Sequence, residues 1–383
     1  MIILYYKNLQ NNYTEGAVVL KLIKRLSIIL LIVSIFFIVY KQKESHDPVM
    51  EYLKTHKADK NVSFILQRDG KNLVSINSDE VIPLASMMKL MIAVEFAKQS
   101  AERTIKADQQ IPLSDLEAYY VKDTDGSAHP DWIHYLKEKK LIQNNQVTLE
   151  QVAKGMLQFS SNANADYLID ELGLENINQT IKNLQLPHHQ EIYPLVSSLY
   201  VAGNLKKEEN LTEDETYKKL KAMSQQEFSR ESIKIHQWMK NPTEFKQRNI
   251  PYLSDMKFQR IWSDNLPAAS AKDYLLLMER LNRKDYFPSN VQKELDKIVE
   301  SLMENPNNKK WLIHAGQKGG STAFLLTNSL YAKDKDGNMT EIVFMFNNLT
   351  ETEYTNLSEN YNKFQLKILK DLKFRNRLIK NLD

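Results

Sequence analysis

Residues 83–96 read PLASMMKLMIAVEF, and this stretch decides how the rest of the chain is interpreted. Ser86 and Lys89 stand three positions apart, so on a helix they lie one turn apart on the same face. Five apolar residues predict that helix, namely Leu90, Met91, Ile92, Val94 and Phe96, and Pro83 fits an irregular start just before it. If the helix begins at Ser86, the Lys89 amine can reach the Ser86 hydroxyl and act as its base.

Two further motifs follow in the order that this chemistry needs. Residues 148–157 carry a capping-box pattern and helical apolar spacing, and they lead directly into Ser-Ser-Asn at 160–162. Residues 318–321 read Lys-Gly-Gly-Ser and supply a cation at the edge of a predicted strand. Together the motifs provide a nucleophile, an amine base, a second hydroxyl and a cation, the parts of an active-site-serine acyl transferase.

Strand patterns occur at both ends of the region that follows residue 45. Asp69-Gly70 is a hairpin signal, because glycine tolerates the positive φ of the turn. Four strands and a final helix are predicted over residues 62–66, 73–76, 324–332, 341–347 and 351–374. We therefore expect an α/β (α+β) fold, in which an antiparallel sheet built from both ends of the chain is flanked by helices.

Helical patterns occupy the middle of the chain, where we expect an inserted all-helical lobe over about residues 100–280. Residues 104–146 are polar and are expected to be irregular, whereas residues 204–260 are charge-rich and predict helices with a solvated face. Asp123, Asp125 and Gly126 lack the remaining ligands of a calcium loop, so a plain turn is expected there. This architecture would place the three motifs along the cleft between the lobes.

The N-terminal segment predicts export. Basic residues precede the uncharged run 26–40, which is short for a bilayer core of ~30 Å unless flanking lysines and a thin membrane close the gap. A retained signal anchor is favoured over a cleaved signal peptide, because no small residues of a cleavage site follow. We expect a signal-anchor segment over 1–45 and a serine hydrolase domain over 46–383. The domain would lie outside the cytoplasm at the cell membrane.

Composition argues against several classes of protein. The formal net charge of +3 is too weak to indicate nucleic acid, and no basic run alternates with aromatic residues. The absence of cysteine excludes disulfides and thiolate metal sites. His188 and His189 show no metal-ligand spacing. We therefore expect no metal, no cofactor and no nucleic-acid partner, and a protein that acts as a monomer.

The three motifs resemble those of the class A β-lactamases and related penicillin-recognising serine enzymes, whose set is SxxK, SDN and KTG. The resemblance covers roughly residues 50–375. It implies that Ser86 is the acylated nucleophile, that Lys89 removes its proton and that Ser160 relays a proton to the leaving nitrogen. It also implies that Asn162 holds both the substrate amide and Lys89.

The same resemblance assigns the third motif to substrate binding. Lys318 would attract a substrate carboxylate, and Gly319, Gly320 and Ser321 would line the substrate. The backbone N–H groups of Ser86 and Ser321 would form an oxyanion hole, where one donor is typically worth roughly 3–4 kcal/mol of barrier.

The chain departs from the family's pattern in three ways. Ser161 stands where SDN has an aspartate, and Gly319 stands where KTG has a threonine, a loss for which Ser321 partly substitutes. No E-x-x-x-N pattern follows the second motif, since Glu191 has Leu195 four positions on. That glutamate activates the deacylating water in the family, so we expect an acyl-enzyme that forms but hydrolyses slowly.

Structural interpretations compete with these roles. Ser160 and Asn162 can simply cap helices, and Lys318 can protect an edge strand from aggregation. The complete set favours an exported, membrane-anchored serine hydrolase that acts on a β-lactam or a related cell-wall amide or ester. A D,D-peptidase or esterase remains an alternative, as does a slow-turnover penicillin-binding protein that senses or scaffolds at the envelope.

Overall fold

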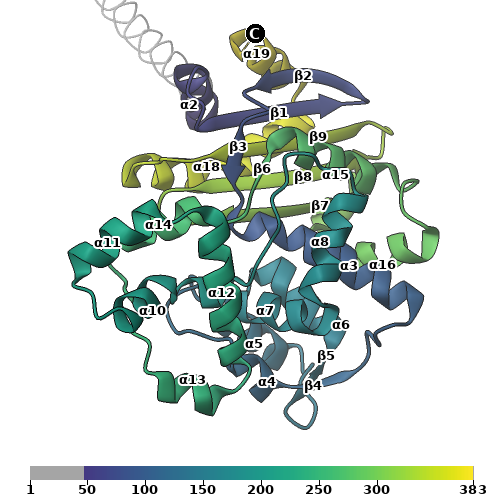
Figure 1. The fold of residues 1–383 in the computed structure, drawn as a ribbon. Coiled ribbons are helices and arrows are strands. Elements are labelled where there is room, and N and C mark those ends of the chain that lie inside the picture. Colours follow the sequence, from purple (N-terminus) through teal and green to yellow (C-terminus); the bar gives the residue numbers. More distant parts are fainter. Residues whose placement is uncertain (1–46, 383) are drawn as a thin grey trace, which may run out of the picture. The chain divides into compact units, whose positions relative to one another are not determined.

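The computed structural model describes residues 47–382. Its largest sheet has five strands in the order β2-β1-β9-β8-β7, and every neighbouring pair is antiparallel (Figure 1). The strands are β1 (Val62–Arg68), β2 (Lys71–Ile76), β7 (Leu312–Ser321), β8 (Leu326–Asp334) and β9 (Met339–Phe346). Val62 of β1 pairs with Phe346 of β9, so both ends of the chain build one sheet. The predicted fold class is confirmed.

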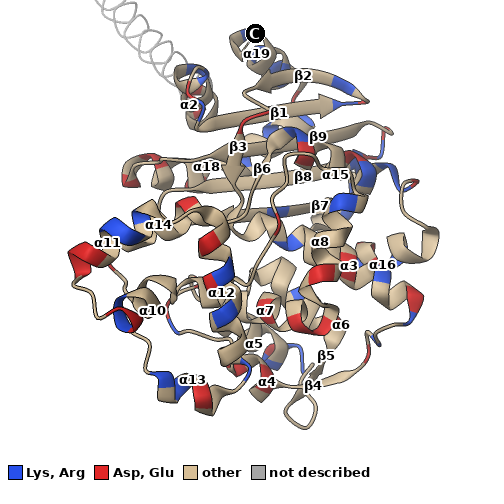
Figure 2. Ribbon diagram, in the orientation of Figure 1, with Lys and Arg blue, Asp and Glu red and all other residues tan. Residues whose placement is uncertain are grey.

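Between β2 and β7 the described chain is mainly helical. The helices are α3 (Lys89–Glu102), α4 (Leu113–Glu117), α5 (Ala128–Glu138), α6 (Leu149–Lys154), α7 (Asn162–Leu172), α8 (Leu174–Asn183), α9 (Leu195–Ser198), α10 (Val201–Glu208), α11 (Glu213–Ala222), α12 (Gln225–Met239), α13 (Pro242–Arg248), α14 (Met256–Asn265), α15 (Ala271–Arg283), α16 (Ser289–Val299) and α17 (Pro306–Lys309). Helices α10 to α14 occupy the charge-rich stretch, as expected. Figure 2 shows both signs of charge interspersed on α11, α12 and α13, which is typical of solvated faces.

Two details differ from the sequence-based expectation for this region. Short antiparallel pairs interrupt the helices, namely β3 (Val81–Pro83) with β6 (Ala268–Ser270) and β4 (Gln110–Pro112) with β5 (Gln146–Thr148). Helix α5 also forms inside the stretch expected to be irregular. It is held by the burial of His129, Trp132 and Leu136 on its inner face. Tertiary packing therefore orders a segment whose polar composition gave no helical signal.

Helix α3 lies in the hydrophobic core and carries the lysine of the first motif. Its residues 89–97 are buried, so the helix has no solvated face over this length. Apart from Lys89 and Glu95 this stretch is apolar, which is typical of a helix inside a protein. Lys89 is therefore taken out of water together with the helix that it begins.

Helices α15 and α18 (Glu351–Lys370) cover opposite faces of the sheet. Asn282 of α15 donates a hydrogen bond to Glu341 at 2.5 Å, whereas the ring of Phe344 meets Tyr361 of α18 edge-on at 5.6 Å. Both Glu341 and Phe344 lie on β9, and side chains three positions apart on a strand point to opposite faces. This alternation decides which residues of β7 face the helical region.

The C-terminal helix ends earlier than the sequence predicted. The pattern indicated one helix to Phe374, but the chain breaks at Asp371 and continues as α19 (Leu372–Leu382). Asp371 has φ −112° and ψ 104°, and its Oδ1 accepts the N–H of Phe374 at 3.0 Å. A short carboxylate that caps the following turn favours a new helix start over a continuous helix.

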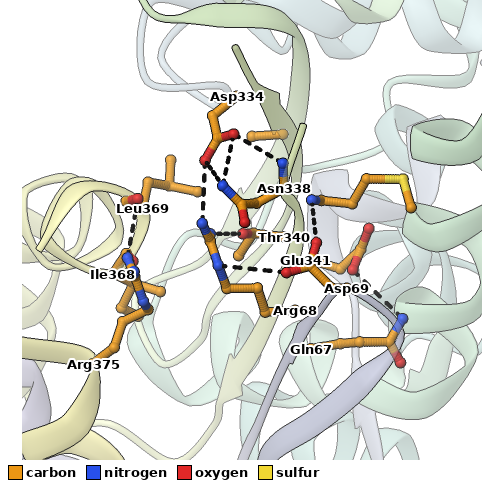
Figure 3. Close-up of polar contacts among 12 residues, drawn as sticks. Gln67, Arg68, Asp69, Asp334, Asn338, Thr340, Glu341, Ile368, Leu369 and Arg375 are labelled. Atoms are coloured by element: carbon orange, nitrogen blue, oxygen red, sulfur yellow. Dashed lines mark hydrogen bonds and ion pairs between the residues drawn. The ribbon is translucent and has the colours of Figure 1, made fainter. Parts of the chain in front are cut away.

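Figure 3 shows a polar cluster where β1 meets the turn between β8 and β9. Arg68 donates to Thr340 Oγ1 at 2.5 Å and to Asp334 Oδ2 at 3.1 Å. Asn338 closes the turn onto Asp334 at 2.9 Å. Since Asp334 pairs with Leu312, this cluster lies at the end of β7 and β8 away from residues 318–321. It fixes the register of the sheet and takes no part in the cleft.

Helix α2 (Pro48–His56) opens the described part of the chain, with Glu51 in its first turn and Lys54 in its last, as the helix dipole favours. None of the helices in residues 47–382 is long and apolar enough to cross a bilayer. The predicted anchor over 26–40 and the predicted boundary at 45 lie outside the described residues.

Candidate active site

Ser86 lies on a short 3₁₀ turn, η1 (Ala85–Met88), which runs directly into α3. The sequence predicted one helix from Ser86, whereas the α-helix itself begins at Lys89. Ala85 has a φ of +45°, a conformation that is costly for a residue with a side chain and persists only where the surroundings impose it. Ser86 itself is half-buried and lines a cleft.

Strand β7 presses its backbone against this turn. A Cβ on Gly320 would lie 2.4 Å from the oxygen of Leu84 and 2.6 Å from the nitrogen of Ser86, so a side chain there would force the two elements apart. Thr327 Oγ1 donates to the same Leu84 oxygen at 2.9 Å. The close approach brings the end of β7, with Ser321, beside Ser86 along the cleft.

The amine of Lys89 is joined to the second motif. Its Nζ donates to the Ser160 carbonyl at 2.5 Å and to Asn162 Oδ1 at 2.7 Å. The side chain is fully buried. No hydrogen bond joins Lys89 to Ser86 among the described residues, so the second motif holds the amine one helical turn from the hydroxyl.

Burial controls the protonation of Lys89. Removal from water lowers its pKa well below the ordinary value, and the positive charge of Lys318 lowers it further. The carboxylates of Asp166 and Asp125 act in the opposite direction and are weaker. A lysine whose pKa is lowered in this way can be neutral near physiological pH and accept a proton.

Lys318 reaches the same group from the opposite wall. Its Nζ donates to Ser160 Oγ and to the Gly319 carbonyl, each at 2.9 Å, and burial lowers its pKa to about 7. Lys89 Nζ lies 3.5 Å from the same Ser160 Oγ. The hydroxyl therefore stands between two buried amines, which is the arrangement that a proton relay needs.

A π-helical turn positions Ser160. Residues 155–159 form the turn, Ser160 follows with φ +70°, and α7 begins at Asn162. A Cβ on Gly155 would lie 2.3 Å from Asn164 Nδ2, so glycine is required where the turn packs on its neighbours. Irregular turns of this kind are frequent at functional sites. The side chain that caps α7 is that of Ser161, whose Oγ accepts the N–H of Asn164, and not that of Ser160 or Asn162.

Ser161 points away from the cleft. It is fully buried, its Oγ lies 3.0 Å from His129 Nδ1, and it donates to Asn164 Oδ1 at 2.9 Å. Burial also lowers the pKa of His129. A neutral hydroxyl beside a neutral imidazole spares this pocket an uncompensated charge. The exchange of aspartate for serine therefore changes a buried network and leaves the cleft surface intact.

The cleft has a volume of about 510 Å³. It brings together Ser86, Ser160, Asn162 and residues 318–321, while Lys89 lies behind them. Further lining residues, which the motifs did not indicate, include Thr124, Asp125, Gln158, Leu195, Gln259, Trp262, Asn328 and Tyr361. All of the predicted site residues are therefore gathered at one place in the fold.

Glu191 is not part of the cleft. It is exposed and pairs with Lys182 at 3.0 Å. Leu195, by contrast, lines the cleft, and Asp166 fixes it by accepting the N–H groups of Leu195 and Val196 at 2.8 and 2.9 Å. The apolar side chain of Leu195 thus lies in the segment that carries the deacylating glutamate in the family's pattern.

Asn328 is a cleft residue that sequence reasoning missed. It pairs with Gly319 across β7 and β8, and Phe344 lies opposite it on β9, so all three positions are on the α18 face. Asn328 is 2% exposed, and its Nδ2 has no hydrogen-bond partner among the described residues. A Cβ on Gly319 would lie 3.1 Å from Asn328 Oδ1. The glycine of the third motif thus leaves room for a neighbouring amide.

Asp125, which was expected to lie in a plain turn without a role in the site, is the second additional cleft residue. The turn that contains it borders the cleft, and Oδ2 accepts the N–H of His129 at 3.0 Å. Its Oδ1 is buried and has no hydrogen-bond partner among the described residues. No spacing within the sequence marks this aspartate, because its relation to Ser86 depends on how α5 packs.

The motifs and the cleft together indicate the β-lactamase-like serine hydrolase family. The chain matches the sequence model of the Beta-lactamase enzyme family over residues 47–319 and belongs to that family. No curated protein matches the sequence.

Several solved structures are similar to the fold. A β-lactamase from Chitinophaga pinensis DSM 2588 is 13% identical, with a TM-score of 0.48, over 79% of this chain and 91% of that one. The penicillin-binding protein PBP-A is 12% identical, with a TM-score of 0.45, over 79% and 88%. The TLA-3 extended-spectrum β-lactamase is 13% identical, with a TM-score of 0.48, over 80% and 94%.

Proposed function

We propose that this protein is an exported serine hydrolase whose Ser86 is acylated by a β-lactam or a related cell-wall amide or ester. The observation that carries the proposal is the hydrogen-bonded set of Lys89, Ser160, Asn162 and Lys318, buried beside the half-exposed hydroxyl of Ser86. Two lysines that share one serine hydroxyl are costly to bury, and a purely structural role gives no reason for them.

The proposed acylation involves three proton transfers. Neutral Lys89 takes the proton of Ser86 as Oγ attacks the carbonyl carbon, and the backbone N–H groups of Ser86 and Ser321 stabilise the resulting oxyanion. Ser160 then donates its proton to the leaving nitrogen and is reprotonated from the neighbouring amines. The bond between carbonyl carbon and nitrogen breaks, leaving an ester on Ser86.

The third motif would hold the carboxylate of the substrate. Lys318 contributes positive charge, and the hydroxyl of Ser321 lies at the exposed end of β7. The amide of Asn328 lies beside Gly319 with no partner of its own, and its N and O exchange places by a half-turn without losing a hydrogen bond to the described residues. We assign to it the donor role of the missing threonine.

The test is labelling of the full chain with a fluorescent penicillin, followed by intact-mass measurement over time. We expect one adduct, located on Ser86 by peptide mapping and absent in Ser86→Ala. An adduct on another residue, or equal labelling of the variant, would overturn the proposal.

A slow-turnover penicillin-binding protein, acting as a sensor or scaffold at the envelope, is the second candidate function. Leu195 in the cleft and the surface position of Glu191 favour it, because neither supplies a base for the deacylating water. Rapid hydrolysis of penicillin without a detectable adduct would exclude this candidate and favour an efficient β-lactamase.

Export by a retained anchor over residues 26–40 completes the proposal. Deletion of residues 1–45 should release a soluble domain that still labels at Ser86, because no motif lies in the deleted segment. Aggregation of the truncated protein, or loss of labelling, would show that the segment is needed for the fold.

A further inference from the structure

We propose that the cleft selects zwitterionic acyl donors, with the substrate carboxylate beside Lys318 and a substrate ammonium group beside Asp125. This inference rests on the proposed function and names the substrate class of the same site. It assigns to Asp125 a role in specificity that the three motifs do not contain.

The distribution of charge in the cleft carries the argument. Among the described residues that line it, Asp125 is the one carboxylate and Lys318 the one basic side chain. They come from different walls, since Asp125 precedes α5 (Ala128–Glu138) and Lys318 lies on β7. No ion pair joins them among the described residues. The Lys318 amine donates its hydrogen bonds to Ser160 Oγ and to the Gly319 carbonyl, and neither acceptor carries a charge. Each charge therefore keeps its attraction for a ligand.

One oxygen of the Asp125 carboxylate accepts a hydrogen bond and the other has no hydrogen-bond partner in the described chain. The N–H of His129 fixes Oδ2 at 3.0 Å, while Oδ1 is buried and without a partner in the described chain. An acceptor that is buried and unpaired destabilises the fold, and a charged acceptor does so more strongly than a neutral one. A ligand that donates a charge-assisted hydrogen bond to Oδ1 recovers that cost, and an ammonium group is such a donor.

Two other roles for Asp125 fit the geometry less well. A deacylating base must lie within hydrogen-bond reach of the water that attacks the Ser86 ester. Asp125 shares no hydrogen bond with Ser86, Lys89 or Asn162 among the described residues, and Gly126 beside it is exposed. Asp125 also raises the pKa of Lys89, but as the last and smallest of four influences. Such an effect on the base would change the acylation of all substrates alike.

The test compares two penicillins that differ by one amine. Ampicillin is benzylpenicillin with an amino group on the carbon beside the side-chain carbonyl, and both carry the same ring carboxylate. At about pH 6, below the ordinary range of α-amino pKa values, that amine is an ammonium group. We expect the full chain to be acylated by ampicillin roughly tenfold more efficiently than by benzylpenicillin, a difference of about 1.4 kcal/mol.

Asp125→Asn keeps the shape of the side chain and its acceptor for His129, and it should bring this ratio to about one. Asp123→Asn is the matched control, because Asp123 is exposed on the same turn, does not line the cleft, and has a φ of +62° that asparagine tolerates. The control should keep the preference for ampicillin. Raising the pH to about 9 should also remove the preference of the unaltered protein, without any substitution.

Equal acylation of the unaltered protein by both penicillins at about pH 6 would overturn this inference and leave the proposed function standing. A preserved ratio in Asp125→Asn would overturn it as well, and a matching slowdown with both penicillins would assign the residue to control of Lys89. Failure of both penicillins to acylate Ser86 would overturn the proposed function and this inference with it. The pH arm needs no variant, so a poorly folded Asp125→Asn does not decide the outcome.

Discussion

The buried amine of Lys318 should lower the free energy of unfolding, and its removal should raise it again. Burial lowers its pKa from 10.5 to about 7, so between these values the unfolded chain binds one more proton than the folded one. The penalty is therefore present in full below about pH 7 and vanishes above about pH 10.5. At about 1.36 kcal/mol per unit of pKa, its upper limit is about 5 kcal/mol.

Lys318→Met removes the charge and keeps the length of the side chain. It also removes the hydrogen bonds to Ser160 Oγ and to the Gly319 carbonyl, which offsets roughly 1–3 kcal/mol. We expect the variant to be about 2–3 kcal/mol more stable than the unaltered protein at pH 7 and to lose its reaction with penicillin. The gain should shrink by about 1.4 kcal/mol for each pH unit above about 7, reach zero at about pH 9 and become a loss above that pH.

Urea denaturation at about pH 7, 8 and 9 measures this change directly. The difference between the two proteins removes the contributions of the groups that they share, except that of Lys89, whose pKa the charge of Lys318 also lowers. Lys335→Met, at an exposed turn position, is the control and should follow the unaltered protein at every pH. The difference in free energy of unfolding between Lys318→Met and the unaltered protein should change with pH. If this difference stays constant from pH 7 to 9, the pKa of Lys318 is not lowered and the reasoning fails.

Three further predictions concern the chemistry. Lys89→Arg keeps the charge, but arginine cannot lose its proton, so this variant should be acylated as poorly as Lys89→Ala. Mass spectrometry should show labelling at least about a hundredfold slower than that of the unaltered protein. Near-full labelling of the arginine variant would exclude the amine as base. The penicillin adduct should persist for minutes or longer, after a burst in which one product molecule forms per enzyme molecule. Glu191→Gln should leave the lifetime of the adduct unchanged, because Glu191 lies on the surface. A sharply longer lifetime in this variant would identify Glu191 as the base. Asn328→Ala should lower the acylation efficiency of benzylpenicillin about tenfold and spare an activated ester without a carboxylate, and an equal loss with both would exclude carboxylate recognition. Gly319→Thr in the same protein should recover part of the loss, since the oxygen 3.1 Å from its Cβ is then gone and the Thr327 carbonyl at 3.2 Å is the close neighbour that must adjust.

Much of the site could be predicted from sequence, because its motifs are local. A serine and a lysine three positions apart share a helical face wherever that helix lies, and a glycine pair in a strand permits close approach of a neighbouring backbone. Ser86 was named on the ground of helical spacing, whereas Ser160, Asn162 and residues 318–321 were named through the resemblance to the family's motifs, and all of them line one cleft. The sheet was predictable for the same reason, since short apolar runs and the turn at Asp69-Gly70 mark its strands.

The sequence could not supply relations between segments that are distant along the chain. Asn328 became a cleft residue only when β7 and β8 paired in one register, and a shift by one position would turn its side chain to the other face. Asp125 lies on a turn with no chemical motif, and the packing of α5 brings it to the cleft. For Glu191 the sequence showed only that the pattern is incomplete, because Leu195 stands four positions on, and the fold adds that Glu191 lies in solvent and pairs with Lys182.

The protonation of the two lysines was likewise decided by the tertiary structure. By sequence, Lys89 and Lys318 are ordinary bases with a pKa near 10.5. The core around α3 and the wall of β7 remove them from water and place both beside Ser160 Oγ, which lowers both pKa values. The sequence alone determined the reactive groups and the turns and helices that carry them. The fold determined their protonation and their neighbours, because desolvation and contact depend on every segment that packs around a group.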